Sequence, residues 1–148
     1  MNLINKNTKF FISIASNPSN FGTLVYNKLF QKFKINAIYK SFKVQDINQL
    51  KKKINFFKIQ GISISMPFKE KVISQVDNLD KITKKILVVN TIKNINGKFH
   101  GFNTDYLAIN SVLKKIKNIK NYNFLINGYG SISKTLIFVL KKLNIKNI

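Results

Sequence analysis

The sequence of 148 residues contains no cysteine, no arginine and a single histidine. Without cysteine the chain has no disulfide framework, no thiolate metal site and no cysteine nucleophile. One histidine excludes a zinc site of clustered histidines and argues against a Ser-His-Asp triad. We therefore expect no metal site, and any chemistry must use lysine, aspartate, serine or asparagine side chains or a bound cofactor.

Acidic residues are scarce: 5 of them stand against 26 basic residues, all lysine, for a formal net charge of +21. Specific reading of bases and forked clamping of phosphates depend on the arginine guanidinium. Scattered lysines support only weak, salt-sensitive binding to DNA. We predict no specific nucleic-acid partner.

Long apolar runs are also missing. No segment approaches the roughly 20 apolar residues that span a bilayer, and the N-terminal segment MNLINKNTKFF lacks the apolar stretch and cleavage site of a signal peptide. We predict a cytoplasmic protein without a membrane partner. The hydrophobic content of 45% is enough to bury the core of an ordinary domain.

What the sequence does contain is an alternation of short apolar runs with amphipathic stretches. Asp46, followed by Gln49 three residues later, is typical of a helix start, and Asn96-Gly97 predicts an antiparallel hairpin at a sheet edge. The alternation of strand and helix predicts an α/β fold with a mostly parallel sheet. In chain order we expect strands at 10–15, 37–44, 61–66, 88–95, 98–102 and 123–127, and helices at 21–33, from 46, from 67, 104–117 and 132–143.

Polar residues gather in three segments, 63–70, 89–91 and 103–106, where predicted strands give way to helices. This is the edge at which α/β sheets bind ligands. By spacing alone, a surface lysine is the more common explanation of Lys69, and an ordinary carboxylate at a helix N-terminus is the more common explanation of Asp105. Both interpretations stay open at this level.

A glycine turn, Gly128-Tyr129-Gly130-Ser131, lies between an apolar run and a predicted helix. Glycines let a phosphate approach the backbone, and a helix N-terminus supplies N–H donors. The third small position of the usual dinucleotide motif is offset, being filled by Ser131 or Ser133. Nucleotide binding and a plain connecting turn both fit this segment.

Taken together, the motifs carry a resemblance to a known family. The chain resembles the N-terminal portion of shikimate dehydrogenases, in particular their shikimate-dehydrogenase-like branch. The segments that carry the resemblance are Asn17 to Gly22 (NPSNFG), Ala37 to Phe42 (AIYKSF), Ser63 to Glu70 (SISMPFKE), Val88 to Ile92 (VVNTI), Gly101 to Ile109 (GFNTDYLAI) and the glycine turn.

The resemblance implies an NADPH-dependent oxidoreductase that reduces 3-dehydroshikimate to shikimate in aromatic amino acid and chorismate biosynthesis. It makes Lys69 and Asp105 the catalytic pair, since carbonyl reduction needs a proton and a positive charge at the developing alkoxide. The implied cofactor is NADP, with NAD left open, and the partner is a small ring acid. A homodimer is also left open.

Binding residues follow from the same resemblance. Asn90 and Ser65 would hold polar groups of the ring, Ser65 standing where the family usually has threonine. The family's serine pair for the substrate carboxylate is not preserved; Ser19 and Asn20 stand at that helix N-terminus instead, which leaves the identity of the ring acid open. The implied cofactor-binding residues are Gly128, Gly130 and Ser131.

The resemblance also implies the domain organisation. We expect a substrate-binding domain at 1–110 and, at 111–148, the first strand and helix of a Rossmann-type dinucleotide-binding domain. One such unit cannot complete a doubly wound sheet, so we expect the chain to stop within that domain. The alternative is a truncated, non-catalytic remnant that at most binds the ring acid.

Overall fold

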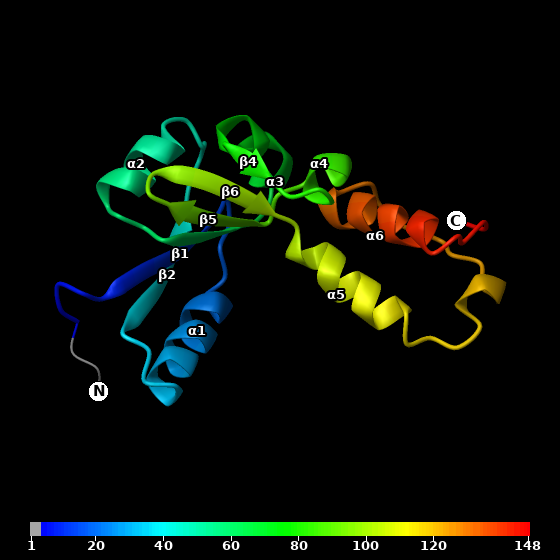
Figure 1. Cartoon of the computed structure of the whole chain (residues 1–148), viewed down its shortest axis with the longest axis horizontal. Helices are drawn as coiled ribbons and strands as arrows, with labels where there is room; N and C mark the ends of the chain where they lie inside the picture. The colour runs from blue at the N-terminus through cyan, green and yellow to red at the C-terminus, as the bar shows by residue number, and fades with distance from the viewer. Residues whose placement is uncertain (1–3) are drawn as a thin grey trace.

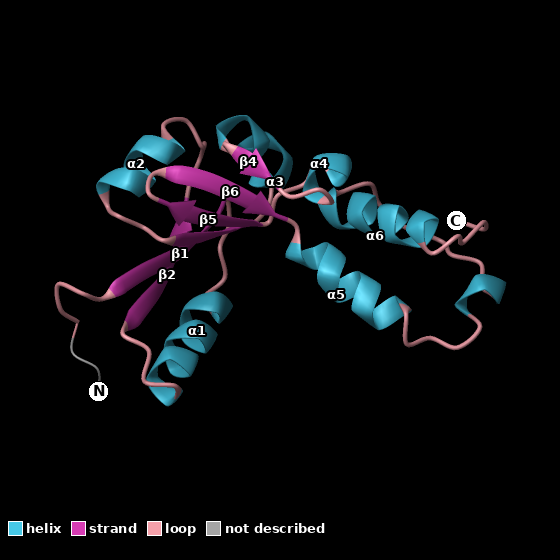
Figure 2. Ribbon diagram, viewed as in Figure 1, coloured by secondary structure: helices cyan, strands magenta, loops and turns pink. Residues whose placement is uncertain are grey.

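The computed structural model describes residues 4–148 as a mixed α/β structure with one sheet (Figures 1 and 2). The first three residues of the segment tested for a signal peptide lie outside the described part. The sheet has six strands in the order β2-β1-β3-β5-β6-β4. They are β1 (Lys9–Ala15), β2 (Ala37–Lys43), β3 (Gly61–Ile64), β4 (Asn78–Leu79), β5 (Thr91–Ile95) and β6 (Lys98–Phe102).

Parallel pairing predominates, as predicted. β1 runs parallel to β2 and β3, β4 runs parallel to β6, and β5 is antiparallel to both of its neighbours. The expected turn forms between β5 and β6, because Asn96 (φ 51°) and Gly97 (φ 83°) adopt the left-handed conformations that a tight hairpin requires. The predicted fold class is therefore confirmed.

Helices cover both faces of the sheet and extend beyond it. In Figure 2, α1 lies against one face and α2 against the other, while α5 and α6 lie side by side past the end of β6. The helices are α1 (Phe21–Lys32), α2 (Leu50–Phe56), α3 (Phe68–Lys71), α4 (Thr83–Ile86), α5 (Thr104–Leu113) and α6 (Ser131–Lys142), with 3₁₀ turns η1 (Val72–Gln75) and η2 (Ile119–Asn121). Within residues 4–148, no helix has the length and apolar character needed to cross a bilayer.

The main core forms on the α2 face because alternate strand residues point the same way. Ile12 of β1 pairs with Ile62 of β3, which pairs with Ile92 of β5, so three isoleucines form one buried row across the sheet. Phe68 of α3 and Phe99 of β6 belong to the same buried cluster. The row fixes the register, since a shift by one residue would expose it.

A second, smaller core joins α5 and α6. Tyr106 and Leu113 of α5 pack with Val139 and Leu140 of α6. Val88, in the segment before β5, also belongs to this cluster and is fully buried. The segment between α3 and β5 therefore bridges the two cores.

The predicted helix start at Asp46 is wrong. The Asp46 carboxylate accepts a hydrogen bond from the Asn48 N–H (2.7 Å), which closes a turn, and α2 begins only at Leu50. Gln49 has φ 57°, a left-handed conformation that a helix interior excludes. The side-chain turn at Asp46 thus replaces the expected capping box.

The predicted strand 88–95 is too long, and its hairpin is not at the edge. β5 begins at Thr91, because the Val89 N–H donates to the Lys69 carbonyl (2.8 Å) and so leaves the ladder. The outer position beside β6 is taken by β4, a two-residue strand that is too short to show a sequence period. This pairing covers the edge that the hairpin would otherwise expose.

Two predictions fail near the C-terminus. Helix α5 ends at Leu113 rather than 117, because the Ile116 N–H bonds to the Leu113 carbonyl in a tight turn. Residues 123–127 are not a strand: one backbone bond, from the Phe124 N–H to the Asn147 carbonyl (3.0 Å), joins them to a neighbouring segment. A strand needs a neighbouring strand that pairs with it along its length, and among the described residues this segment has only the one backbone bond.

Candidate active site

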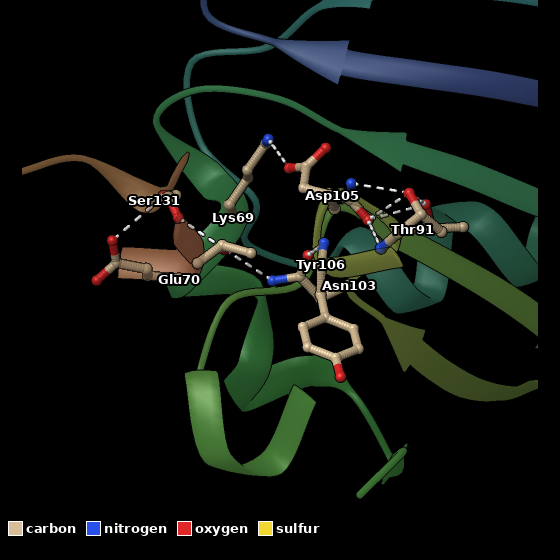
Figure 3. A network of polar contacts seen from close by, with 10 residues as sticks. Lys69, Glu70, Thr91, Asn103, Asp105, Tyr106 and Ser131 are labelled. Atoms are coloured by element: carbon tan, nitrogen blue, oxygen red, sulfur yellow. Dashed lines mark hydrogen bonds and ion pairs between the residues drawn. The ribbon is translucent and has the colours of Figure 1, made fainter. Parts of the chain in front are cut away.

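The Lys69 and Asp105 side chains meet at the sheet edge, as predicted. Lys69 Nζ lies 2.8 Å from Asp105 Oδ2, although 36 positions separate the two residues. Figure 3 shows the side chains pointing toward one another, Lys69 from α3 and Asp105 from α5. The side chains are 13% and 26% exposed, so the pair is largely sheltered from solvent.

Each residue of the pair is held in place by contacts of neighbouring residues in its own segment. Phe68, 2% exposed, anchors α3 in the main core beside Lys69, whose carbonyl accepts the Val89 N–H. On the other side, the Asn103 carboxamide caps α5 by accepting a hydrogen bond from the Tyr106 N–H (2.9 Å). This cap starts the helix so that Asp105 falls in its first turn, where the helix dipole favours a carboxylate.

Asn90 is bound into a polar network beside Asp105. Its Oδ1 accepts the Thr104 N–H (2.9 Å), and its Nδ2 lies 2.9 Å from the Thr104 hydroxyl. The Thr91 hydroxyl donates to the same Oδ1 (3.1 Å). Asn90 therefore finds the partners that a polar residue in this position requires, and it links the start of β5 to the first turn of α5.

A polar pocket of about 280 Å³ lies beside the N-terminus of α1. Ser19 and Ser65, two of the predicted substrate-binding residues, belong to its lining. Asn20 is exposed at the N-cap of α1, and neither Asn20 nor Asn90 is among the lining residues. The structure thus brings Ser19 and Ser65 together and leaves Asn20 at the rim.

Two further serines in this pocket were missed by the sequence analysis. Ser13 of β1 and Ser41 of β2 pair across the sheet, with their hydroxyls 2.9 Å apart, and the Thr23 hydroxyl lies 3.0 Å from Ser41 Oγ. Three hydroxyls with two contacts leave at least one proton free to donate elsewhere. The available signal was a lone serine on the α1 face of each apolar strand.

A larger, mostly apolar groove of about 560 Å³ lies on the α1 face of the sheet. Its walls include Thr91 and Thr104, the two partners of Asn90. Aromatic rings from β1 and α1, Phe11 and Phe30, line its other side and lie 5.8 Å apart. A ligand with an apolar ring that lies in this groove would contact the hydrogen-bonding partners of Asn90.

The glycine turn lies at the N-terminus of α6 with its backbone open. Gly128 has φ 108°, which favours glycine, and space above both Gly128 and Gly130 is free of protein atoms within 4 Å of where a Cβ would stand. The backbone of the turn is therefore accessible to a ligand. The Ser131 hydroxyl, however, points to Glu70 Oε1 (3.2 Å).

The charge near this turn is already paired. Lys134, in the first turns of α6, forms an ion pair with Glu70. The hydrogen bond from Lys134 lowers the pKa of the Glu70 carboxyl below its ordinary 4.5, and the same bond raises the pKa of Lys134 above 10.5.

In residues 4–148, no three His, Asp or Glu side chains gather as a metal site would require.

Comparison with known proteins identifies the family. Residues 20–92 match the family model described as the shikimate dehydrogenase substrate binding domain. A shikimate dehydrogenase-like protein of Haemophilus influenzae is 38% identical over 94% of this chain and 51% of its own length. The NADP(+) shikimate dehydrogenase of Pyrococcus furiosus is 37% identical over 95% and 52%. The chain spans about half the length of these curated relatives.

Solved structures agree with the sequence matches. A shikimate 5-dehydrogenase-like protein superimposes with a TM-score of 0.88 at 36% identity, over 98% of this chain and 54% of that one. Shikimate dehydrogenase of Aquifex aeolicus gives 0.82 at 32% identity, over 95% and 54%. A shikimate dehydrogenase in complex with NADP+ gives 0.81 at 30% identity, over 95% and 50%. The chain thus belongs to the shikimate dehydrogenase family, a family of oxidoreductases.

Proposed function

We propose that this chain carries the substrate-binding part of an NADPH-dependent enzyme that reduces 3-dehydroshikimate to shikimate. The observation that carries the proposal is the 2.8 Å ion pair between Lys69 and Asp105 at the edge of the sheet. Membership of a family whose relatives are named NADP(+) shikimate dehydrogenases supports it. We assign the substrate-binding domain to residues 1–110 and the start of the nucleotide-binding domain to 111–148.

Lys69 is the proposed proton donor. Reduction of a ketone places negative charge on the carbonyl oxygen, and an ammonium beside that oxygen both stabilises the charge and supplies the proton. Asp105 holds the Lys69 side chain in place through the ion pair. NADPH, when bound, supplies the hydride, and Gly128, Gly130 and Ser131 would hold its phosphates.

The ring acid would lie between the serine pocket and the Asn90 network. Ser19 and Ser65 offer hydroxyl groups to its polar substituents, and Asn90 offers its amide. Asn20 stands at the N-terminus of α1, where the helix dipole favours a carboxylate. We infer a small-molecule partner and a cytoplasmic protein, with a homodimer still a prediction from sequence.

Substrate binding can be tested on the chain itself. We expect shikimate to bind the purified chain in a calorimetric or NMR titration, and Lys69→Met to weaken binding about tenfold, because a hydrogen bond to a charged group is lost. Lys71→Met is the matched control, since Lys71 lies exposed two residues further along α3. Equal affinities of the two variants would contradict the assignment of Lys69.

Activity needs a complete cofactor site. For the 148-residue chain alone we expect NADPH oxidation near background, because misplacing the hydride by about 1 Å costs on the order of 100-fold. A chimera with the C-terminal half of the Pyrococcus furiosus relative should oxidise NADPH with 3-dehydroshikimate. Lys69→Met should abolish that turnover and Lys71→Met should not. A chimera that binds shikimate but shows no turnover would instead support the non-catalytic alternative.

A further inference from the structure

Helix α6 is tied to both segments that carry the proposed catalytic pair. Glu70, next to Lys69 in the chain, contacts Ser131 and Lys134 in the first turns of α6. Asn103, two residues before Asp105, donates through Nδ2 to the Thr135 hydroxyl (3.0 Å) one turn further along. Figure 3 shows the Ser131 hydroxyl facing the Glu70 carboxylate.

The Asn103 contact is a structural anchor. Asn103 is 4% exposed and Thr135 is fully buried, and the Thr135 hydroxyl also donates to the Ser131 carbonyl (2.9 Å). Because both side chains are buried and hydrogen-bonded, a change in their relative position would leave a buried polar group without a partner. It fixes how far α6 stands from the start of α5.

The Glu70 contact is different because it is exposed and charged. The Glu70 side chain is 42% exposed, and its two oxygens go to two different residues of α6, Ser131 Oγ and Lys134 Nζ. Lys134 Nζ also lies 5.4 Å from the centre of the Tyr129 ring, inside the glycine turn. One carboxylate therefore orients the turn, the first residue of α6 and a lysine one turn later.

An exposed ion pair adds little stability, so Glu70 is not needed to hold the fold together. Its effect is geometric: α3 is short, and a shift of Glu70 moves its neighbour Lys69 as well. Asn103 contacts α6 at Thr135, whereas Glu70 contacts Ser131, the last residue of the glycine turn. The two contacts restrain different motions of the same helix.

We propose that Glu70 is a positioning residue, which holds the glycine turn in a fixed orientation to Lys69 so that a bound nucleotide and the proton donor stay in register. The roles of Lys69 and of the turn in this statement rest on the proposed function. The partners of Glu70 are Ser131 and Lys134.

The test compares Glu70→Gln with Asp77→Asn in the 148-residue chain. Asp77 forms a second exposed ion pair, with Lys51, far from α6 in the chain, and is the matched control. Hydrogen exchange at the amides of residues 134–138 and shikimate affinity are measured in that chain, and NADP+ is titrated into the chimera carrying the same variants. We expect Glu70→Gln to speed this exchange about fivefold and to weaken NADP+ binding by a similar factor. Shikimate affinity should stay within about twofold. Asp77→Asn should change neither the exchange rates nor the affinity for NADP+ or shikimate.

A charge exchange distinguishes positioning from a general loss of structure. Glu70→Lys combined with Lys134→Glu restores the ion pair with its signs reversed, and we expect it to return the exchange rates of α6 to within about twofold of the original. Unchanged exchange and NADP+ affinity in Glu70→Gln, or a double variant no better than the single ones, would overturn the positioning role. If shikimate does not bind the unmodified chain, the proposed function fails, while the exchange data still decide the role of Glu70.

Discussion

Two segments with similar apolar sequences, 10–15 and 123–127, have different structures. The first is part of β1 and pairs with β2 on one side and β3 on the other. The second joins its neighbour through one backbone bond at Phe124, and Leu125 within it is 97% exposed. Apolar sequence alone does not make a strand, because the hydrogen bonds of a strand are made to other segments.

The helices of the two regions, in contrast, both form as predicted. α1 in the sheet region and α6 beyond it both have 12 residues, and both lie within a residue of their predicted bounds. Backbone hydrogen bonds of a helix are internal, so the local pattern suffices. The sheet region is thus defined by pairing, and the C-terminal region by two helices packed on a small core.

The largest expected effect tests the sheet core. Phe99→Ala should lower the free energy of unfolding by about 3–5 kcal/mol, because a fully buried ring leaves a cavity. Phe56→Ala is the control: that ring is 79% exposed, and its loss should change stability by no more than about 0.5 kcal/mol. Urea unfolding followed by circular dichroism measures both. Similar losses in the two variants would mean that the sheet core is not packed as described.

A pair of glycine variants separates the two regions more sharply. A Cβ at Gly101 would stand 2.8 Å from Leu79 Cδ2 and 3.0 Å from Val76 Cγ1, so Gly101→Ala should cost about 1–3 kcal/mol through overpacking. Gly130 has open space around it and φ −86°, so Gly130→Ala should cost less than about 0.5 kcal/mol. Thermal unfolding of both variants measures this. The reverse order of stabilities would contradict the comparison of the two regions.

Acid should loosen the C-terminal region through Glu70. Because Lys134 lowers the pKa of Glu70 in the folded state, the pair contributes stability above about pH 4.5, and this contribution is lost as the pH falls through the lowered value. Hydrogen exchange of α6 between pH 6 and pH 3, corrected for intrinsic rates, should speed up more in the unmodified chain than in Glu70→Gln. Parallel pH profiles of the two proteins would refute this prediction.

The smallest effect is expected where the predicted strand did not form. Leu125→Ser should leave the free energy of unfolding within about 0.5 kcal/mol, since the side chain buries almost no surface. Ile14→Ser, in the segment that did form a strand, is the comparison and should be strongly destabilising, because Ile14 is 1% exposed. A large loss from Leu125→Ser would indicate that residues 123–127 are packed in solution.

The sequence by itself determined the fold class, most helices, the hairpin turn and, through the resemblance, the family. These features follow from local hydrogen bonding, from periodic burial and from motifs of adjacent residues. The juxtaposition of Lys69 and Asp105 was also predictable, because both follow strands that end at one edge of the sheet.

Only the tertiary structure decided the other long-range side-chain contacts near the site. Ser13 and Ser41 meet across 28 positions through the β1–β2 register, and Glu70 reaches Lys134 across 64. It also decided that 123–127 would not form a strand and that β4 would cover the sheet edge. Each of these outcomes depends on which segments become neighbours, and the pattern within one segment does not identify its neighbour.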